Sequence, residues 1–529
     1  MKTNFRMLAK YLTYRNLYLL GFSSLFFSLS VSLFVISLSQ IFLGLIWLTE
    51  RNYKSKLNRV SRNKFFWLIV SIFLFHLLGL LYTAEFNYAF NDLRIKLPIL
   101  LIPFFFASIA PLKKAETRTI FFFFIAGLIV STSFSYCDFL SASGAQGFDV
   151  RNASHFISHI RLSLMMALAI IFLIFELVKN KVNPFFRVLL GLTSISFLIY
   201  MLQLQMLSGV FALGIAGFVV VEVKIFKLKN TLYKKSAFIL SLILVITIGA
   251  YVFSAVESFV FPNTNSALCK VSKKTANGND FIFNAKNKQL ENGNLVWDQV
   301  CEYELEKEWN KMSEISYYNN GNTGQAVRFS LIRYLTSKKL PKDSDGIRQL
   351  SSQEVNDIEN GATNFKFIQN KGLSKRIYET AWELHNYIVN KGNPSGNSVA
   401  QRIEFWRAAK YVIKHNLLFG VGTGDIVVEL NKAYVEINTV LSPEYRYKPH
   451  NQYITIFVTF GFIGLVWFLA VLLNCFIHLK NNYLGFAFLI IVSLSMLMED
   501  TIETQVGVTF FAGFISLFAI GMVKQTDQN

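Results

Sequence analysis

The sequence has 529 residues, of which 53% are hydrophobic and 16% are charged, and its formal net charge is +19. Soluble domains carry about 25% charged residues, so this composition excludes an ordinary soluble protein. Long apolar stretches recur along the sequence, each near the ~20 residues that cross a bilayer as a helix. A polytopic helical membrane protein is therefore predicted. No nucleic-acid partner is expected, because the positive charge lies in short loops between apolar stretches, where it orients membrane proteins.

The first apolar stretch follows a basic start and runs from about residue 17 to 48. It is longer than the roughly 7–15-residue core of a signal peptide, and no small-residue cleavage site ends it. We expect two uncleaved spans here, joined by a tight turn near Ser28–Ser32. About twelve spans are predicted in all, at approximately 15–30, 32–48, 65–82, 97–110, 119–137, 162–178, 186–204, 207–223, 237–254, 452–478, 483–498 and 506–523.

Lysine and arginine in the loops predict the orientation of these helices. Basic loops follow every second predicted span and therefore share one side, the cytoplasm, with both ends of the chain. Their residues include Arg51, Lys54, Lys56, Arg59, Arg62, Lys64, Lys113, Lys114, Arg118, Lys179, Lys181, Arg187, Lys224, Lys227, Lys229, Lys234, Lys235, Lys480 and Lys524. The intervening loops then face outward.

One outward loop, from about Ser254 to His450, is close to 200 residues long and thus domain-sized. Helical segments are expected in it at 299–315, 325–338, 365–390 and 399–415. The expected divisions are residues 1–254 with nine spans, the loop domain 255–450 with the motifs described below, and residues 451–529 with three spans.

Two of the four cysteines, Cys269 and Cys301, lie in this loop. They could form a disulfide if the loop faces an oxidising compartment. Two free thiols are an equal alternative, because the sequence does not determine the pairing. Cys137 and Cys475 lie in or beside apolar spans, where buried inert thiols are expected.

Lysine and arginine residues on the predicted outer side are exceptions to the rule that positive charge lies on the cytoplasmic side. They are therefore candidates for binding an anion. Arg94 and Lys96 precede the span at 97–110, Arg161 opens a later span, and Arg402 lies in the loop domain. Arginine contacts phosphate oxygens in pairs and stays charged, so such groups would suit a diphosphate. Alternatively, each reaches the interface or pairs with a local acid. The two readings are balanced for Arg94 and Lys96, and we favour anion binding for Arg161 and Arg402.

His450 stands at the junction of the loop domain and a span. Imidazole titrates near neutral pH, which suits a general base that deprotonates a sugar hydroxyl. A lone interfacial histidine more often has no such role, but Asn451, Gln452 and Tyr453 beside it favour a site.

Two further clusters are ambiguous. Glu499, Asp500 and Glu503, at the outer end of a span, could orient the histidine or an arginine, or could form a solvated loop. His155 and His159 share a helix face, but no third ligand lies near them in the sequence, so no metal is expected.

A glycine-rich segment holds Gly420, Gly422, Gly424 and Asp425. Its backbone N–H groups could approach an anion. It lacks the Gly-Lys-Ser/Thr of a nucleotide-binding loop, and the alternative is a tight turn with glycine at a helix C-terminus.

At these residues the sequence resembles the O-antigen ligase and polymerase family of bacterial envelope enzymes. The ordered set covers about 65 residues, and the predicted twelve-span layout is similar along the whole chain. The similar segments are Arg402–Trp406, Leu418–Asp425, His450–Tyr453 and Phe460–Gly464, with weaker likeness at Asp92–Pro98, His159–Arg161 and Glu499–Gly507.

The resemblance implies an all-α, GT-C-like polytopic fold in the bacterial inner membrane, with one large, mainly helical periplasmic insert. It implies an inverting glycosyltransferase that needs no metal or cofactor. The donor would be a glycan on undecaprenyl diphosphate, and the leading acceptor is lipid A–core. His450 would activate the acceptor hydroxyl, and Arg161 and Arg402 would bind the departing diphosphate. Supporting residues would be Trp406, Gly422, Gly424, Asp425, Asn451, Tyr453, Glu499 and Asp500.

One departure concerns Ser208-Gly209, where many members carry Ser-Arg. Either another cation, such as Arg94 or Lys96, replaces that arginine, or diphosphate binding differs.

Other functions remain open at this point. An O-antigen polymerase or a protein O-oligosaccharyltransferase would use the same donor and base. A polysaccharide flippase predicts internal repeats and charges near the membrane midplane, whereas these spans are almost free of charge. A scaffold protein predicts that replacing His450 leaves envelope glycans unchanged.

Overall fold

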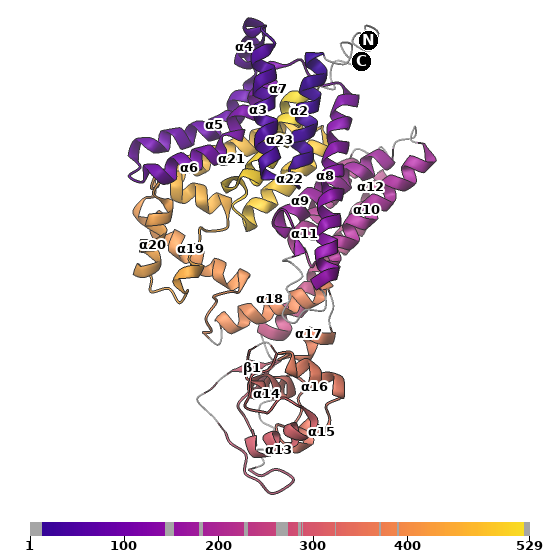
Figure 1. Ribbon diagram of the computed structural model, residues 1–529, viewed down its shortest axis with the longest axis vertical. Helices are drawn as coiled ribbons and strands as arrows, with labels where there is room; N and C mark the ends of the chain where they lie inside the picture. The colour runs from indigo at the N-terminus through magenta and orange to yellow at the C-terminus, as the bar shows by residue number, and fades with distance from the viewer. Residues whose placement is uncertain are drawn as a thin grey trace, which may run out of the picture. The chain divides into compact units, whose positions relative to one another are not determined.

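The computed structural model describes residues 13–142, 153–178, 183–226, 231–260, 273–283, 287, 289–322, 324–369, 372–388 and 391–522 (Figure 1). These residues form helices almost throughout. The strands named within them are a two-stranded antiparallel pair, β1 (Leu290–Glu291) and β2 (Asn294–Leu295).

The chain divides into two compact units. The transmembrane unit comprises Met1–Leu140, Arg151–Lys234 and Arg402–Asn529, and the insert unit comprises Ser141–Val150 and Lys235–Gln401. Residues 402–450, which we expected with the loop domain, therefore belong to the same unit as most apolar helices.

Each of the twelve predicted spans coincides with a helix. Six of the helices described are long and apolar enough to cross a membrane. The polytopic helical class is confirmed, and the count of twelve stays a prediction. The helices are α2 (Tyr14–Ser28), α3 (Leu33–Thr49), α5 (Lys64–Leu78), α7 (Pro98–Ser108), α8 (Lys114–Ala142), α9 (His159–Leu177), α10 (Pro184–Gln203), α11 (Leu207–Phe226), α12 (Thr231–Val260), α21 (Gln452–Leu479), α22 (Tyr483–Met498) and α23 (Gln505–Ser516).

Local signals set several of these boundaries. The Ser32 hydroxyl accepts from the backbone N–H of Val35 and starts α3 directly after the expected turn. Asn63 caps α5 by accepting from two backbone N–H groups, and Pro98 occupies the first turn of α7, where its missing N–H costs nothing. Shorter elements complete the unit: α4 (Tyr53–Arg62), η1 (Gly79–Tyr82), α6 (Phe86–Lys96), α19 (Ser398–His415), α20 (Ile426–Glu436), η4 (Pro443–Tyr445), η5 (Thr501–Glu503) and η6 (Leu517–Gly521).

Helix α9 lies at the centre of the transmembrane unit. The most apolar part of this helix is 72% buried, which is the highest share among the six candidate spans. Phe172 stacks on Phe121 of α8 with ring centroids 4.2 Å apart, and α9 also packs against α10, α11 and α22. Arg161, in the first turn of α9, is therefore fixed to a rigid element.

A smaller core joins α19 and α20 to the start of α21. Phe405, Ala409, Ile426, Tyr434 and Val458 are buried together in it. This packing sets the positions of the segments that carry Arg402 and His450.

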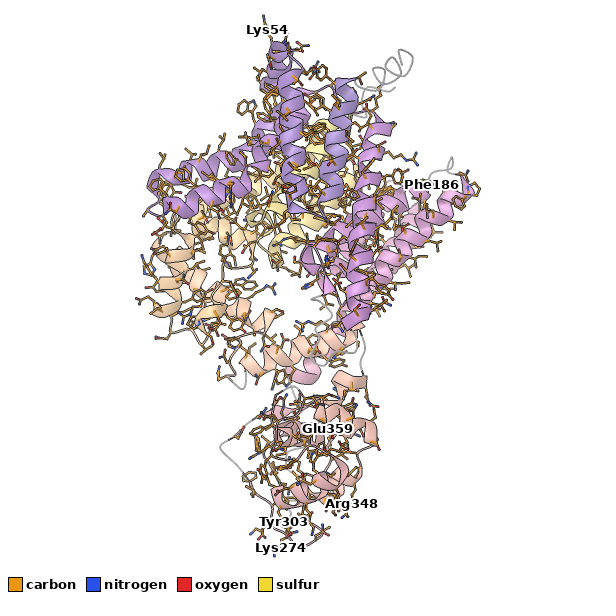
Figure 2. The ribbon with its side chains drawn as sticks, in the orientation of Figure 1. Lys54, Phe186, Lys274, Tyr303, Arg348 and Glu359 are labelled. Carbon is orange, nitrogen blue, oxygen red and sulfur yellow. The ribbon has the colours of Figure 1, made fainter. Side chains whose placement is uncertain are left out.

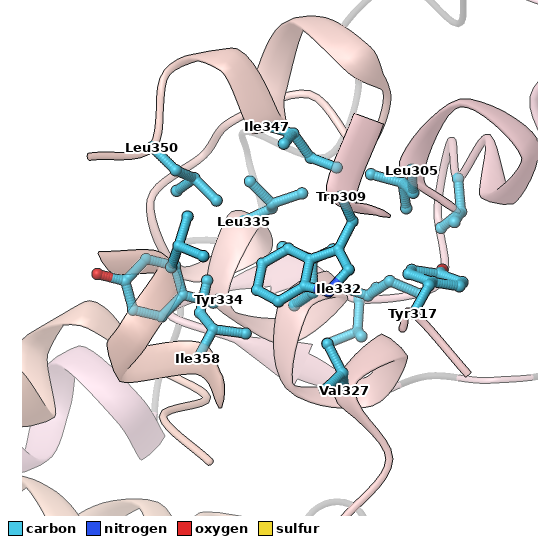
Figure 3. Close-up of a cluster of buried hydrophobic side chains, with 14 residues drawn as sticks. Leu305, Trp309, Tyr317, Val327, Ile332, Tyr334, Leu335, Ile347, Leu350 and Ile358 are labelled. Carbon is cyan, nitrogen blue, oxygen red and sulfur yellow. The ribbon is translucent and has the colours of Figure 1, made fainter. Parts of the chain in front are cut away.

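The insert unit has its own hydrophobic core around Trp309, Leu331 and Ile332 (Figure 3). Besides most of α12, its helices are α13 (Glu302–Met312), α14 (Val327–Ser337), α15 (Ser344–Arg348), α16 (Ser352–Glu359), α17 (Phe365–Gln369) and α18 (Gly372–Ile388). Tyr303 and Arg348 project from its surface (Figure 2). Cys301 is a buried free thiol here, which fits the alternative of two free thiols, and Cys269 lies outside the described residues.

Candidate active site

The backbone of His450 is held in a conformation that non-glycine residues seldom adopt. Its φ is +49°, in the left-handed region. The carboxylate of Asp500 accepts from the His450 backbone N–H at 3.0 Å and from the Thr455 hydroxyl at 2.6 Å. Asn451 caps α21 and donates to the Leu497 carbonyl at 3.0 Å. Several independent contacts therefore determine this geometry, as is common at functional sites.

Glu499 lies between His450 and Arg402. One of its oxygens is 3.5 Å from His450 Nδ1, and the other accepts from Arg402 Nη2 at 3.3 Å. The histidine contact is longer than an ordinary hydrogen bond, and such contacts tighten when substrate binds. With the carboxylate beside Nδ1, Nε2 is the nitrogen left to face a substrate. The ring lies between Phe405 and Tyr447, at centroid distances of 5.6 and 6.2 Å.

His450 opens onto a pocket of about 280 Å³. The pocket combines three cations with three carboxylates in addition to the histidine. Its lining comprises Arg161, Val427, Leu430, Asn431, Tyr434, Arg446, Tyr447, Lys448, His450, Glu499, Asp500, Glu503 and Thr504.

Arg161 is the cation most available to an anionic ligand. The carboxylates of Glu499 and Asp500 act on it electrostatically. No residue in the described part of the chain makes an ion pair or hydrogen bond with its guanidinium. A desolvated guanidinium with spare donors is a strong site for phosphate oxygens.

The pKa values of two acidic residues of the pocket shift in opposite directions. Burial alone would raise the pKa of Glu499, but His450, Arg402 and Arg161 outweigh it and hold that pKa below its ordinary value. Burial raises the pKa of Asp500, although Lys448 opposes the shift. Glu499 is therefore anionic at neutral pH and can orient the imidazole.

Lys96 pairs with acids, as the alternative reading of this cation predicted. It is fully buried, and its ammonium lies 2.5 Å from Asp92 and 3.0 Å from Glu503. Glu503 also pairs with Lys448 at 2.9 Å. Lys96 is thus committed to a buried charge network beneath the pocket and has no surface with which to bind a donor.

Arg94 also lies outside the pocket. It is exposed and donates to the Asn91 side chain at 2.7 Å. Its exposure fits the alternative reading, in which this cation reaches the interface.

The glycine-rich turn has a structural role, because its hydrogen bonds hold neighbouring segments together. The N–H groups of Val421 and Gly422 donate to the carbonyls of Val458 and Thr459, at 3.0 and 2.9 Å. Gly424 N–H donates to the Thr83 hydroxyl, and the Asp425 carboxylate accepts from the N–H groups of Ala84 and Glu85. These donors are occupied within the protein, so the tight-turn interpretation fits and the anion-binding one does not.

Two aromatic residues of the similar segments stabilise the site through hydrogen bonds. Trp406 donates its indole N–H to the Pro449 carbonyl at 3.0 Å, directly before His450. Tyr453 donates to the Ser493 carbonyl at 3.1 Å and so joins α21 to α22.

His155 is paired with an acid. Its Nδ1 lies 2.6 Å from Asp138. Among the described residues, no three His, Cys, Asp or Glu side chains are grouped so as to hold a metal ion.

Sequence reasoning missed Arg446 and Lys448 as pocket residues. Both are cations on the predicted outer side within four residues of His450. The rule that singled out Arg161 and Arg402 would have found them. Gln452 was noted only as a neighbour, yet it accepts from the Ile502 N–H and donates to Glu503.

Fold and site define a polytopic membrane protein with a histidine–carboxylate pair and three cations in one pocket. Residues 367–469 match the family model described as O-antigen ligase. This match includes Arg402, Trp406, the glycine-rich turn and His450, and it agrees with the resemblance that the motifs indicated. No curated protein matches the chain.

Proposed function

We propose that this protein is an O-antigen ligase that transfers a glycan from undecaprenyl diphosphate to a hydroxyl of lipid A–core at the outer face of the inner membrane. The observation that carries the proposal is the Glu499–His450 pair in a pocket that also holds Arg161. The match to O-antigen ligases supports the ligase or polymerase class.

His450 acts as the general base. Nε2 takes the proton from the acceptor hydroxyl while its oxygen attacks the anomeric carbon of the donor sugar. Glu499 holds the imidazole and stabilises the imidazolium that forms. Attack from the face opposite the leaving group forms the new glycosidic bond with inversion, as the resemblance implies.

The cations stabilise the leaving group. As the bond from the anomeric carbon to the diphosphate oxygen breaks, negative charge builds up on undecaprenyl diphosphate. Arg161 is placed to receive it, with Arg402 beside Glu499 and with Arg446 and Lys448 across the pocket. Preorganised cations of this kind contribute most when charge develops in the transition state. Arg446 and Lys448 fill the role that Arg94 and Lys96 were expected to fill.

An envelope glycan profile tests the proposal. A deletion strain is complemented with wild type, His450→Asn, Glu499→Gln or Arg161→Gln, with membrane levels matched. His415→Asn, an exposed histidine on α19 outside the pocket, is the control. We expect each pocket variant to lower transfer by about 10²-fold or more, with polymer accumulating on undecaprenyl diphosphate, and the control to complement.

The same profile identifies the acceptor. Loss of long polymer from lipid A–core supports the ligase. Single-repeat caps would indicate a polymerase, and an unchanged lipopolysaccharide with missing protein glycans would indicate a protein-directed transferase. Full complementation by His450→Asn would refute the catalytic role and favour a scaffold or transporter.

A further inference from the structure

A second cavity, of about 550 Å³, lies at the other end of α9 from the active site. It reaches Glu176, whereas Arg161 lines the catalytic pocket. Fifteen residues of helix separate the two, a distance of about 22 Å. The cavity is therefore distinct from the proposed catalytic site.

Five of the fourteen residues that line this cavity are aromatic. Phe121 and Phe172 stack at 4.2 Å between α8 and α9, and Phe175 stacks on Tyr483 of α22 at 6.2 Å. Phe518 also lines the cavity. Such walls suit an acyl chain rather than a soluble ligand.

Two cations, Lys114 and Arg118, line the cavity. The Nε of Arg118 is 2.7 Å from the buried carboxylate of Glu176. The Arg118 side chain is 42% exposed, and that of Glu176 only 3%. The Nη groups of Arg118 have no hydrogen-bond acceptor among the described residues. The guanidinium thus neutralises one buried acid and keeps donors for a ligand.

A third cation, Lys224 in the last turn of α11, does not line the cavity but packs against two aromatic residues that do. Its ammonium lies 4.3 Å from the Phe175 ring centroid and 5.4 Å from that of Tyr483. Within the described part of the chain it forms no ion pair with a carboxylate. The aromatic walls therefore hold an ammonium group whose charge is not neutralised by an acid.

We propose that this cavity binds an anionic phospholipid of the cytoplasmic leaflet. The phosphate would lie between Arg118 and Lys224, and an acyl chain would run along the aromatic walls. The lysine- and arginine-rich loops predict that this end of α8 faces the cytoplasm. Basic pockets between membrane helices on that side are suited to anionic headgroups.

Lipid retention on the purified full-length protein tests this proposal. Native mass spectrometry from detergent would compare phosphatidylglycerol with phosphatidylcholine. The variants are Lys224→Gln and Arg118→Lys, the second of which keeps a positive charge beside Glu176. The control, Lys54→Gln, removes an exposed lysine of α4, which is on the same predicted side but outside the cavity. The melting temperature without lipid confirms that each variant is folded.

We expect wild type to retain phosphatidylglycerol in preference to phosphatidylcholine, and Lys224→Gln to bind it about fivefold more weakly. Arg118→Lys should also weaken binding, because an ammonium lacks the paired donors of a guanidinium. Lys54→Gln should bind as wild type does. Equal retention of the two lipids, or equal losses in Lys224→Gln and Lys54→Gln, would overturn the proposal. So would full displacement of the lipid by equimolar glycerol phosphate, which would indicate a soluble phosphate ligand.

Discussion

Glu499 shows how one side chain can contact two groups of a site. It lies beside His450, the proposed general base, and neutralises part of the charge of Arg402. The guanidinium of Arg161, in contrast, forms no ion pair within the described part of the chain. The sequence raised Glu499 as a possible orienting acid, and its assignment to these two partners depends on residues 49 and 97 positions away in the chain.

Lys96 and Arg94 form a matched pair for a test at the scale of single residues. Lys96→Met should destabilise the protein by about 3–5 kcal/mol, because it leaves Asp92 and Glu503 in a buried site without their shared cation. Arg94→Met should change stability by less than about 0.5 kcal/mol, because this side chain is exposed. Thermal unfolding in detergent measures both. A stable but inactive Arg94→Met protein would restore the donor-binding role for Arg94.

Glu304 of the insert unit gives a pH-dependent prediction. Burial opposes its ionisation, but hydrogen bonds from Asn279, Thr275 and Ser344 outweigh burial and lower its pKa to about 2. A glutamate in the unfolded chain titrates near about 4.3. A lowered pKa in the folded state stabilises the protein above the unfolded value, and this contribution is lost as pH falls from about 4.3 towards 2.

We therefore expect Glu304→Gln to destabilise the insert at neutral pH and to flatten its loss of stability in acid. Hydrogen exchange of peptides spanning α13, compared between variants at each pH, measures this effect. Glu314→Gln, an exposed glutamate of the same unit, should behave as wild type does. Parallel pH profiles for wild type and Glu304→Gln would contradict the assignment.

At the scale of elements, two glycines allow the turn before α20 to dock against α21. Gly420 and Gly461 have φ values of +71° and +65°. A Cβ at Gly420 would lie 2.4 Å from the Thr459 carbonyl carbon, and one at Gly461 would lie 2.3 Å from that of Leu418. Helix α21 leaves helical geometry at Gly461, where Phe462 N–H donates to the Leu417 carbonyl at 2.8 Å.

Either Gly420→Ala or Gly461→Ala should therefore cost more than about 1–3 kcal/mol, since backbone strain and a backbone clash act together. Gly214→Ala is the control, because it lies within α11, where an added Cβ would have nothing within 4 Å. It should be neutral or stabilising by up to about 1 kcal/mol. The midpoint of thermal unfolding separates these outcomes, and equal midpoints for all three variants would contradict the docking argument.

At the scale of the whole molecule, the lysine and arginine pattern predicts which loops face the cytoplasm. Epitope tags inserted after Asn52 and after Gly278 test the orientation, because both sites are exposed. The tag at 278 should bind antibody on intact spheroplasts, and the tag at 52 only after permeabilisation. The reverse pattern would invert the topology and place the proposed active site in the cytoplasm, where the proposed periplasmic transfer could not occur.

The sequence by itself determined the membrane class, the positions of the apolar helices and the set of motif residues. These follow from local properties: runs of apolar side chains, capping residues such as Ser32 and Asn63, and short motifs with fixed spacing. In the predicted loop domain 255–450, all four predicted helical segments coincide with helices. The helices α15, α16 and α20 were missed there, and α15 and α16 have only 5 and 8 residues.

Only the tertiary structure decided which polar residues meet. Lys96 joins Glu503 across 407 positions, and Asp425 accepts from the backbone of Ala84 across 341. Lys96 is therefore a buried structural cation, and the glycine-rich turn holds neighbouring segments together through hydrogen bonds. A charged side chain has similar local preferences whether it pairs internally or faces a ligand. Its role depends on the partner that helix packing brings to it, because burying a charge without a partner is so costly.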